Sequence, residues 1–141
     1  MTERSEVQHV TDLRTTDLGL ELRSPIVASA GPLTRDVETA QRLEAAGAGA
    51  IVMPSLFEEE IVHEEVELSY ALEAGAEHFP EAIDYFPRFG VIDSVVDRYL
   101  STVGELKDAL DIPVIASLNG TTTGGWVNYA QMLANAGADA L

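Results

Sequence analysis

The stretch DIPVIASLNGTTTGGWVNYAQMLANAGADAL, residues 111–141, indicates how the chain folds. Its apolar run after Pro113 predicts a buried strand over 114–118, a loop rich in glycine and threonine follows, and apolar residues at helical spacing predict a helix over 126–136. The last nine residues, LANAGADAL, are similar to LEAAGAGAI at 43–51, with five identities and one Ile/Leu exchange. The repeat predicts a recurring joint between a helix and the next strand, and we expect the sequence to stop at the first residue of a fourth strand.

The segments before this stretch also read as strands separated by helices. Alternating apolar and polar residues around Gly19 predict a short hairpin within 13–26. Apolar runs predict buried strands over 26–30 and 50–53, and Pro54 is expected to end the second. Strand, helix and strand joined by short links are typical of a βαβ unit in a parallel sheet.

Three further helices are predicted from apolar residues that recur every three or four positions. They cover 37–46, most of 57–75, and 94–110. Thr34 or Asp36 is expected to cap the first helix, Asp93 the third, and Thr123 the last one in the chain. The segment 74–91 contains prolines and aromatic residues without a period, which predicts a loop.

This order of elements predicts an α/β fold, and the repeated joint favours a barrel over an open sheet. A whole (β/α)₈ barrel typically needs about 250 residues, whereas this chain has 141. We therefore expect the N-terminal part of a TIM (β/α)₈ barrel, about three to four βα units preceded by a short β-hairpin. A polar N-terminal segment is expected over 1–12 and the partial barrel domain over 13–141.

Composition narrows the classes of function. Eight Lys and Arg against 24 Asp and Glu give a net charge of −16, so nucleic acid is not expected as a partner. The absence of cysteine excludes disulfides, thiolate metal ligands and a cysteine nucleophile from these residues. No apolar run approaches the length of about 18 residues that spans a bilayer, and the N-terminus has no signal-peptide pattern. The sequence therefore predicts a soluble, cytoplasmic protein.

Small residues with free backbone groups follow each predicted strand, at the end where a barrel carries its chemistry. Such residues allow a flat polar ring to approach closely, as a flavin or nucleotide requires, and an asparagine amide both donates and accepts. The alternative is that they serve only as turn residues between strand and helix. The residues concerned are Ser29, Ala30 and Gly31, then Met53, Pro54 and Ser55, then Ser117, Asn119 and Gly120.

Two other patterns suggest sites but carry weaker signals. The loop GTTTGG at 120–125 could hold a phosphate at a helix N-terminus, but it lacks the lysine of a P-loop and is better explained as a connector. Glu60, His63 and Glu64 share a helix with further glutamates, and their spacing matches no metal motif, so no metal site is predicted. No residue pattern supplies a catalytic nucleophile or general base with its orienting partner.

Three segments of the chain together resemble the N-terminal half of class 1 dihydroorotate dehydrogenases and their relatives. They are SPIVASAGPLT at 24–34, RLEAAGAGAIVMPSLFEEEI at 42–61 and IPVIASLNGTTTGGWVNYAQMLANAGADAL at 112–141. The last is also similar to part of the pyrimidine-reducing domain of dihydropyrimidine dehydrogenase. The resemblance implies an FMN-containing barrel that oxidises dihydroorotate to orotate in pyrimidine biosynthesis, with hydride transfer to the flavin.

The resemblance also implies roles for individual residues. Ser29, Ala30 and Gly31 match the loop that lies along the flavin, and Ser55 matches the small hydroxyl residue after the second strand. Ser117 and Asn119 would face the same site from the third strand. The implied ligands are FMN and a pyrimidine-like substrate.

The chain departs from the family pattern at several places. Pro54 stands where the family usually has a lysine, and 82–91 reads AIDYFPRFGV in place of the asparagine-containing substrate loop. The family's segment near the catalytic base would follow residue 141, so we expect the isolated chain to lack that base. Two alternatives follow: a flavin barrel that acts on another substrate, or a non-catalytic half barrel that assembles with a copy of itself or a partner. A homo-oligomer is expected because a half barrel leaves strand edges unpaired.

Overall fold

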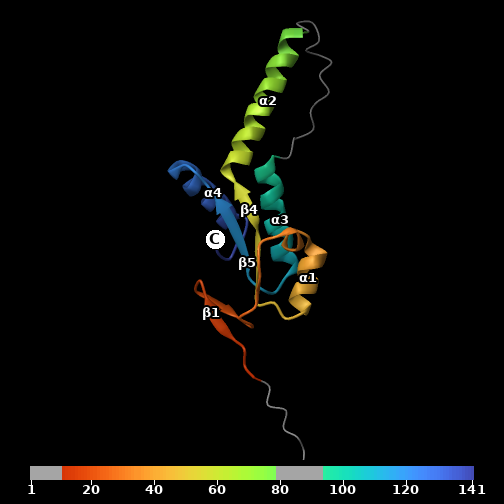
Figure 1. Cartoon of the computed structure of the whole chain (residues 1–141), viewed down its shortest axis with the longest axis vertical. Coiled ribbons are helices and arrows are strands. Elements are labelled where there is room, and N and C mark those ends of the chain that lie inside the picture. The colour runs from red at the N-terminus through yellow and green to blue at the C-terminus, as the bar shows by residue number, and fades with distance from the viewer. Residues whose placement is uncertain (1–10, 79–93) are drawn as a thin grey trace, which may run out of the picture.

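Three parallel strands lie at the centre of the structure, a computed structural model that describes residues 11–78 and 94–141 (Figure 1). They are β3 (Val27–Ala28), β4 (Ala50–Phe57) and β5 (Val114–Asn119). β4 lies between the other two, so the strands stand side by side in the order in which they occur in the chain.

A hairpin and a series of helices surround these strands. The hairpin pairs β1 (Thr15–Asp17) with β2 (Leu20–Leu22), and the helical segments are η1 (Pro32–Thr34), α1 (Val37–Ala45), α2 (Glu58–His78), α3 (Val95–Ala109) and α4 (Thr123–Asn135). The predicted α/β order with an N-terminal hairpin is confirmed. The described residues form no closed barrel.

The two faces of the sheet are covered by different parts of the chain. On one face, Ile51 and Met53 pack with α1, α3 and α4 in a single apolar cluster. On the other face, Ala50 and Ile115 pack with Leu22 of the hairpin. Each large apolar side chain that is fully buried in these clusters contributes about 1.5–3 kcal/mol to folding. The helices therefore hold one face, and the hairpin covers the amino-terminal end of the other.

The two copies of the repeated joint have the same backbone geometry. Gly47 and Gly137 have φ values of 103° and 101°, and the N–H that follows each glycine bonds to the carbonyl five residues earlier. This left-handed helix end is the conformation for which glycine is preferred. After the second joint, Ala140 forms a parallel bridge with Ile115 of β5, at the position expected for a fourth strand.

The joints differ at the residue that enters the next strand. A Cβ atom at Gly49 would lie 2.0 Å from the carbonyl oxygen of Ser24, so only glycine fits there. The equivalent residue of the second joint is Asp139, whose carboxylate accepts the N–H of Val114 and a 2.7 Å ion pair from Lys107. The two joints thus share one backbone conformation, although the side chains around Gly49 and Asp139 differ.

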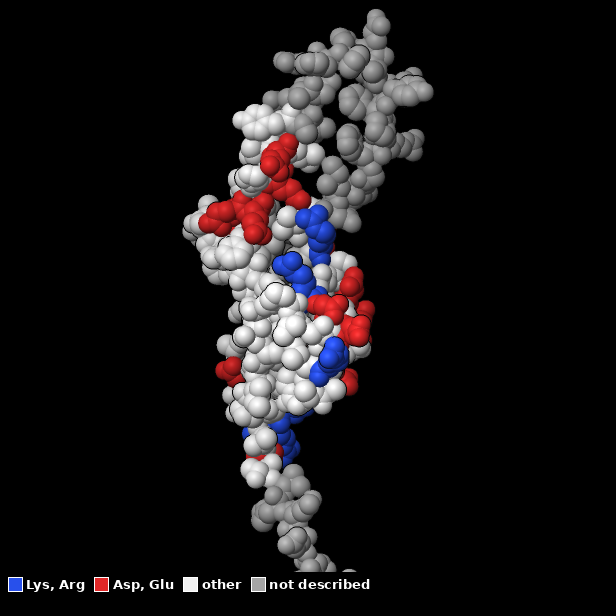
Figure 2. All heavy atoms as spheres, turned by 45° about the vertical axis from the view of Figure 1, so that its right-hand side comes forward, with Lys and Arg blue, Asp and Glu red and all other residues white. Residues whose placement is uncertain are grey.

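Helix α2 runs beyond the end of the sheet (Figure 1). Its first turns bury Ile61 in the core, but Leu68 further along the helix is 40% exposed. Its neighbours Val66 and Tyr70 are more exposed still. Figure 2 shows acidic side chains gathered over this helix. In the described parts of the chain, neither α2 nor any other helix is long and apolar enough to cross a lipid bilayer.

Strand β4 continues through Pro54 by means of a β-bulge. Between Val52 and Ser55 the strand advances three residues, while β5 advances two, from Ile115 to Ser117. A bulge tolerates proline because the missing N–H is not needed in the ladder there. The prediction that Pro54 ends the strand is therefore wrong. The extra residue also turns Ser55 toward the face on which Val52 lies.

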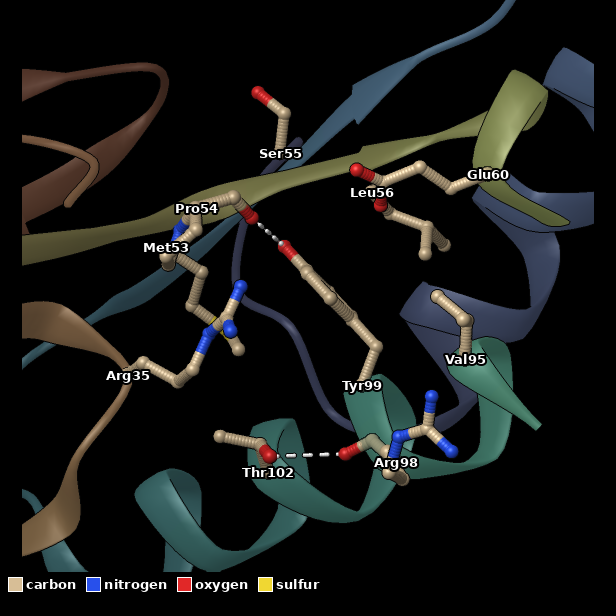
Figure 3. A pocket seen from close by; sticks show the side chains of 10 residues that line it. All are labelled: Arg35, Met53, Pro54, Ser55, Leu56, Glu60, Val95, Arg98, Tyr99 and Thr102. Atoms are coloured by element: carbon tan, nitrogen blue, oxygen red, sulfur yellow. Dashed lines mark hydrogen bonds between the residues drawn. The ribbon is translucent and has the colours of Figure 1, made fainter. Parts of the chain in front are cut away.

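The hydroxyl of Tyr99 occupies the gap that the bulge leaves between β4 and β5. It donates a 2.8 Å hydrogen bond to the carbonyl of Pro54 and accepts the N–H of Ser117 at 3.1 Å. Figure 3 shows the Tyr99 ring on one side of β4 and the Ser55 side chain on the other. A side chain from α3 thus replaces the backbone pairing that the bulge removes.

Several boundaries differ from those predicted from sequence. The first central strand covers only Val27–Ala28, not 26–30. Helix α2 extends through His78, so the loop predicted from residue 74 is wrong up to that point, and its remainder lies outside the described residues. Helix α4 begins at Thr123, three residues before the predicted start.

Helix caps were predicted at the right places but not always at the right residue. Asp36, one of two candidates, caps α1 by accepting the N–H of Thr39 at 2.8 Å. Ser94 caps α3 in place of Asp93, and Thr122 caps α4 in place of Thr123. The caps of α3 and α4 each lie one residue from the predicted position, a displacement common at helix ends.

We expect Tyr99→Phe to lower the free energy of unfolding by about 1–3 kcal/mol, because the Pro54 carbonyl and the Ser117 N–H lose their partner. Urea denaturation followed by circular dichroism measures the change. Tyr70→Phe is the matched control, since Tyr70 is 68% exposed. Equal stability of the two variants would contradict the role given to the Tyr99 hydroxyl.

Candidate functional site

Three of the predicted site residues lie together at the carboxyl-terminal end of the sheet. Ser55 and Ser117 are paired in register, and their Oγ atoms share a 2.7 Å hydrogen bond. Asn119 follows Ser117 by two residues, so it lies on the same face, and it is exposed. The hairpin covers the other end of this face, which leaves these polar residues accessible within the described structure.

The loop of Ser29, Ala30 and Gly31 lies at the same end of the sheet, because it follows the parallel strand β3. Ser29 and Ala30 are exposed. Gly31 is held by Thr34, whose hydroxyl accepts the Gly31 N–H at 3.3 Å and donates to its carbonyl at 3.0 Å. No hydrogen bond between described residues joins this loop to the serine pair.

The other residues considered at the strand ends have structural surroundings of their own. Met53 is buried in the core on the helix side of the sheet, away from Ser55. Gly120 lies against the ring of Trp126, whose indole N–H donates to its carbonyl at 2.7 Å. Trp126 is 41% exposed, although it begins the apolar pattern from which its helix was predicted.

Glu58, the first residue of α2, binds the loop that precedes α4. Its carboxylate accepts the backbone N–H groups of Thr121 and Thr122, the latter at 2.8 Å, and the hydroxyls of both threonines. The Thr122 hydroxyl in turn accepts the N–H of Gly125 at 3.0 Å and so caps α4. These contacts join the end of β4 to the end of β5.

This arrangement explains the GTTTGG loop. Backbone N–H groups at the start of a helix form an anion site, and here the anion is the carboxylate of Glu58, which is only 6% exposed. A Cβ atom at Gly125 would lie 2.1 Å from that carboxylate, so the glycine makes room for it. The loop is therefore not an open phosphate cradle, in agreement with its interpretation as a connector.

Hydrogen bonds to the charged form lower the pKa of Glu58 to about 2. The hydroxyl and N–H of Thr122 have the largest effect, followed by the N–H of Thr121. Burial opposes this shift but does not overcome it. The Glu58 side chain therefore stays ionised at neutral pH.

Neither Glu58 nor the Tyr99 hydroxyl was identified from the sequence. In the sequence, Glu58 is one of several consecutive glutamates, and Tyr99 lies among the apolar residues of its helix. The one local signal for Glu58 is its place directly after a strand, with a pair of threonines after the next strand. Their contact spans more than sixty positions, which no helical or strand period indicates.

The described residues contain no group of three metal-binding side chains. Glu64 accepts the N–H of Val95 at 2.6 Å and pairs with Arg98 at 3.5 Å. His63 lies 3.7 Å from Glu67. The acidic face of α2 thus holds the start of α3 through Glu64.

The half-buried serine pair and the exposed Asn119 supply hydrogen-bond donors and acceptors but no group that titrates near neutral pH. Burial raises the pKa of the nearby Tyr99 hydroxyl, which keeps it protonated. Burial and the charges of Glu65 and Glu58 likewise raise the pKa of Tyr129. The arrangement can therefore bind and orient a polar ring, whereas proton transfer requires another residue.

No protein-family model matches the chain, and a search of curated proteins found no match either.

We expect Glu58→Gln to lower the melting temperature at neutral pH, because the loop loses a charged acceptor. The pKa of the Glu58 carboxyl is lowered from 4.5 to about 2 on folding, so its ionised form stabilises the folded state fully above pH 4.5. This stabilisation is lost as the pH falls toward 2. The difference in melting temperature between wild type and Glu58→Gln should therefore decrease from pH 4.5 to pH 2.

Glu59→Gln is the matched control, because the neighbouring Glu59 is exposed. It should change the melting temperature little at any pH. A difference between Glu58→Gln and wild type that stays constant from pH 6 to pH 3 would contradict the proposed role of the ionised carboxylate.

Proposed function

We propose that the chain forms one wall of the cofactor site in an FMN-dependent oxidoreductase similar to the dihydroorotate dehydrogenases. The observation that carries the proposal is the accessible sheet end with Ser55, Ser117 and Asn119 on one face. Small side chains there allow a flat ring to approach the strands, and the Asn119 amide can donate and accept at its edge.

The arrangement of the helices supports a barrel as the architecture of this enzyme. The strands stand in sequential order, and α1, α3 and α4 share one face of the sheet. Doubly wound sheets place helices on both faces, whereas a barrel places them all outside. The parallel bridge at Ala140 extends the same order by one further position.

The residues of this chain fit the ring of FMN better than its phosphate. FMN supplies the hydride acceptor when bound, and the protein supplies binding and orientation. The N–H groups of Thr121 and Thr122, the nearest helix-terminal donors, are engaged by Glu58. The phosphate would then be held by residues outside the described structure, and the hydroxyls of Ser55 and Ser117 would line the ring.

Pro54 favours a substrate other than dihydroorotate. The position that usually carries a lysine in the family is part of the bulge, and its carbonyl is bonded to Tyr99. A polar pyrimidine would lack that charged contact. A diverged flavin enzyme acting on a pyrimidine-like C–C bond is thus the form of the proposal that this site supports best.

A second candidate is a half barrel that assembles without catalysis. Beyond the bridge at Ala140, the outer edge of β5 is unpaired within the described residues. Such an edge is a template for pairing with another chain. Sedimentation of the full chain distinguishes the candidates in combination with the flavin experiment: an oligomer that takes up no FMN supports the half barrel.

We expect FMN added to the full chain to shift the backbone amide signals of Ser55, Ser117 and Asn119 in ¹H–¹⁵N NMR spectra. Asn119→Ala should weaken binding about tenfold, the effect of one hydrogen bond. Asn128→Ala is the matched control, because Asn128 is exposed on α4. A titration that leaves these three signals unchanged, or that affects both variants equally, would contradict the proposal.

A further inference from the structure

A cavity of about 350 Å³ lies on the helix side of the sheet, opposite the side toward which Ser55 points (Figure 3). It is bounded by the bulge of β4, the first turns of α3 and the segment between η1 and α1. Its size is at the lower end of that of small-molecule sites. Ser55 of the proposed flavin site also borders this space, but its side chain points to the opposite side of β4, so the cavity needs an explanation of its own.

Two of the eight basic residues of the chain line this cavity, Arg35 and Arg98. Other basic side chains are engaged elsewhere: Arg14 with Asp12, and Lys107 with Asp139. The side chain of Arg35, by contrast, has no hydrogen-bond or ion-pair partner among the described residues, although its backbone N–H donates to the carbonyl of Pro32. Figure 2 shows basic side chains on this side of the molecule, between acidic patches.

The net charge of −16 does not decide the potential inside the cavity. Charges on the surface are screened over about 8–10 Å at physiological salt, so the groups that line the cavity dominate. The lining contains two arginines, Arg35 and Arg98, and one carboxylate, that of Glu60, and Arg98 is paired with Glu64 outside the lining. The guanidinium of Arg35 is therefore the cation that the cavity offers to a ligand.

The rest of the lining adds selectivity. Val95 and the ring of Tyr99, both half-buried, provide apolar surface, and the planar guanidinium of an arginine binds the oxygens of a carboxylate or phosphate in a fork. Glu60 would repel a second negative charge on a ligand. These features together select a molecule with one anionic end and an apolar body.

We propose that this cavity is a binding site for a small organic anion, with its carboxylate or phosphate facing Arg35 and its apolar part lying against Val95 and the ring of Tyr99. In Figure 3 the Arg35 guanidinium extends toward β4 and the Tyr99 ring. The site is separate from the proposed flavin wall and does not depend on it. Because Tyr99 both lines the cavity and bonds the bulge, an occupant would contact the residue that fixes Ser55.

The test is an NMR titration of the full chain with butyrate and with butyl phosphate, which separates the two anionic groups, against sodium chloride at equal ionic strength. At least one probe should shift the amide signals of Val95 and Tyr99 and saturate. Arg35→Gln should weaken that binding about tenfold or more, because a charge-assisted contact is lost. Arg42→Gln, an exposed arginine of α1 outside the cavity, should leave it unchanged.

Glu60→Gln provides a test with the opposite sign. Removal of its charge should strengthen binding several-fold, which partial unfolding would not do. Equal effects of butyrate, butyl phosphate and chloride on wild type would overturn the proposal. Identical affinities of wild type and Arg35→Gln would overturn it as well. If the full chain binds one of the organic anions but does not bind FMN, the anion site is supported and only the flavin proposal is contradicted.

Discussion

The hydroxyl of Tyr99 fixes the geometry on which both proposed sites depend. It bridges the Pro54 carbonyl and the Ser117 N–H where the bulge separates β4 from β5. Buried backbone groups need partners, and without this bridge the strands would have to close the gap by shifting register. A shift by one residue would return Ser55 to the helix side of the sheet and break its pairing with Ser117.

Glu58 plays a corresponding part a few residues further along the chain. It joins the start of α2 to the loop before α4. The ends of β4 and β5 are therefore connected by two side chains, the neutral phenol of Tyr99 within the sheet and the carboxylate of Glu58 beyond it. An acidic chain thus uses one of its own charges to fill an anion site at a helix terminus. Ser55 and Ser117, the polar residues at the strand ends, lie between these two connections.

Local patterns in the sequence predicted the elements well. The hairpin turn around Gly19, the glycine-ended joints at Gly47 and Gly137 and the capped helices are each set by a few adjacent residues. The bulge, the Tyr99 bridge and the Glu58 contact were not predicted, because each joins residues far apart in sequence through side chains that have an ordinary local explanation. Of the candidate site, Ser55 and Ser117 were expected at the ends of neighbouring strands, but their hydrogen bond was not predicted, because the strand was expected to end before Ser55.

The hairpin has a consequence for the order in which the molecule assembles. Its own strands pair within eight residues, so this contact is available early. The surface that its apolar side covers is not available early. Leu22 of the hairpin packs with Ile115, and Ala140 near the end of the sequence belongs to the same cluster. Contacts of such long sequence separation form late, because the loop-closure entropy must be overcome first. We therefore expect the hairpin of β1 and β2, although it is synthesised early, to dock onto the sheet late in folding.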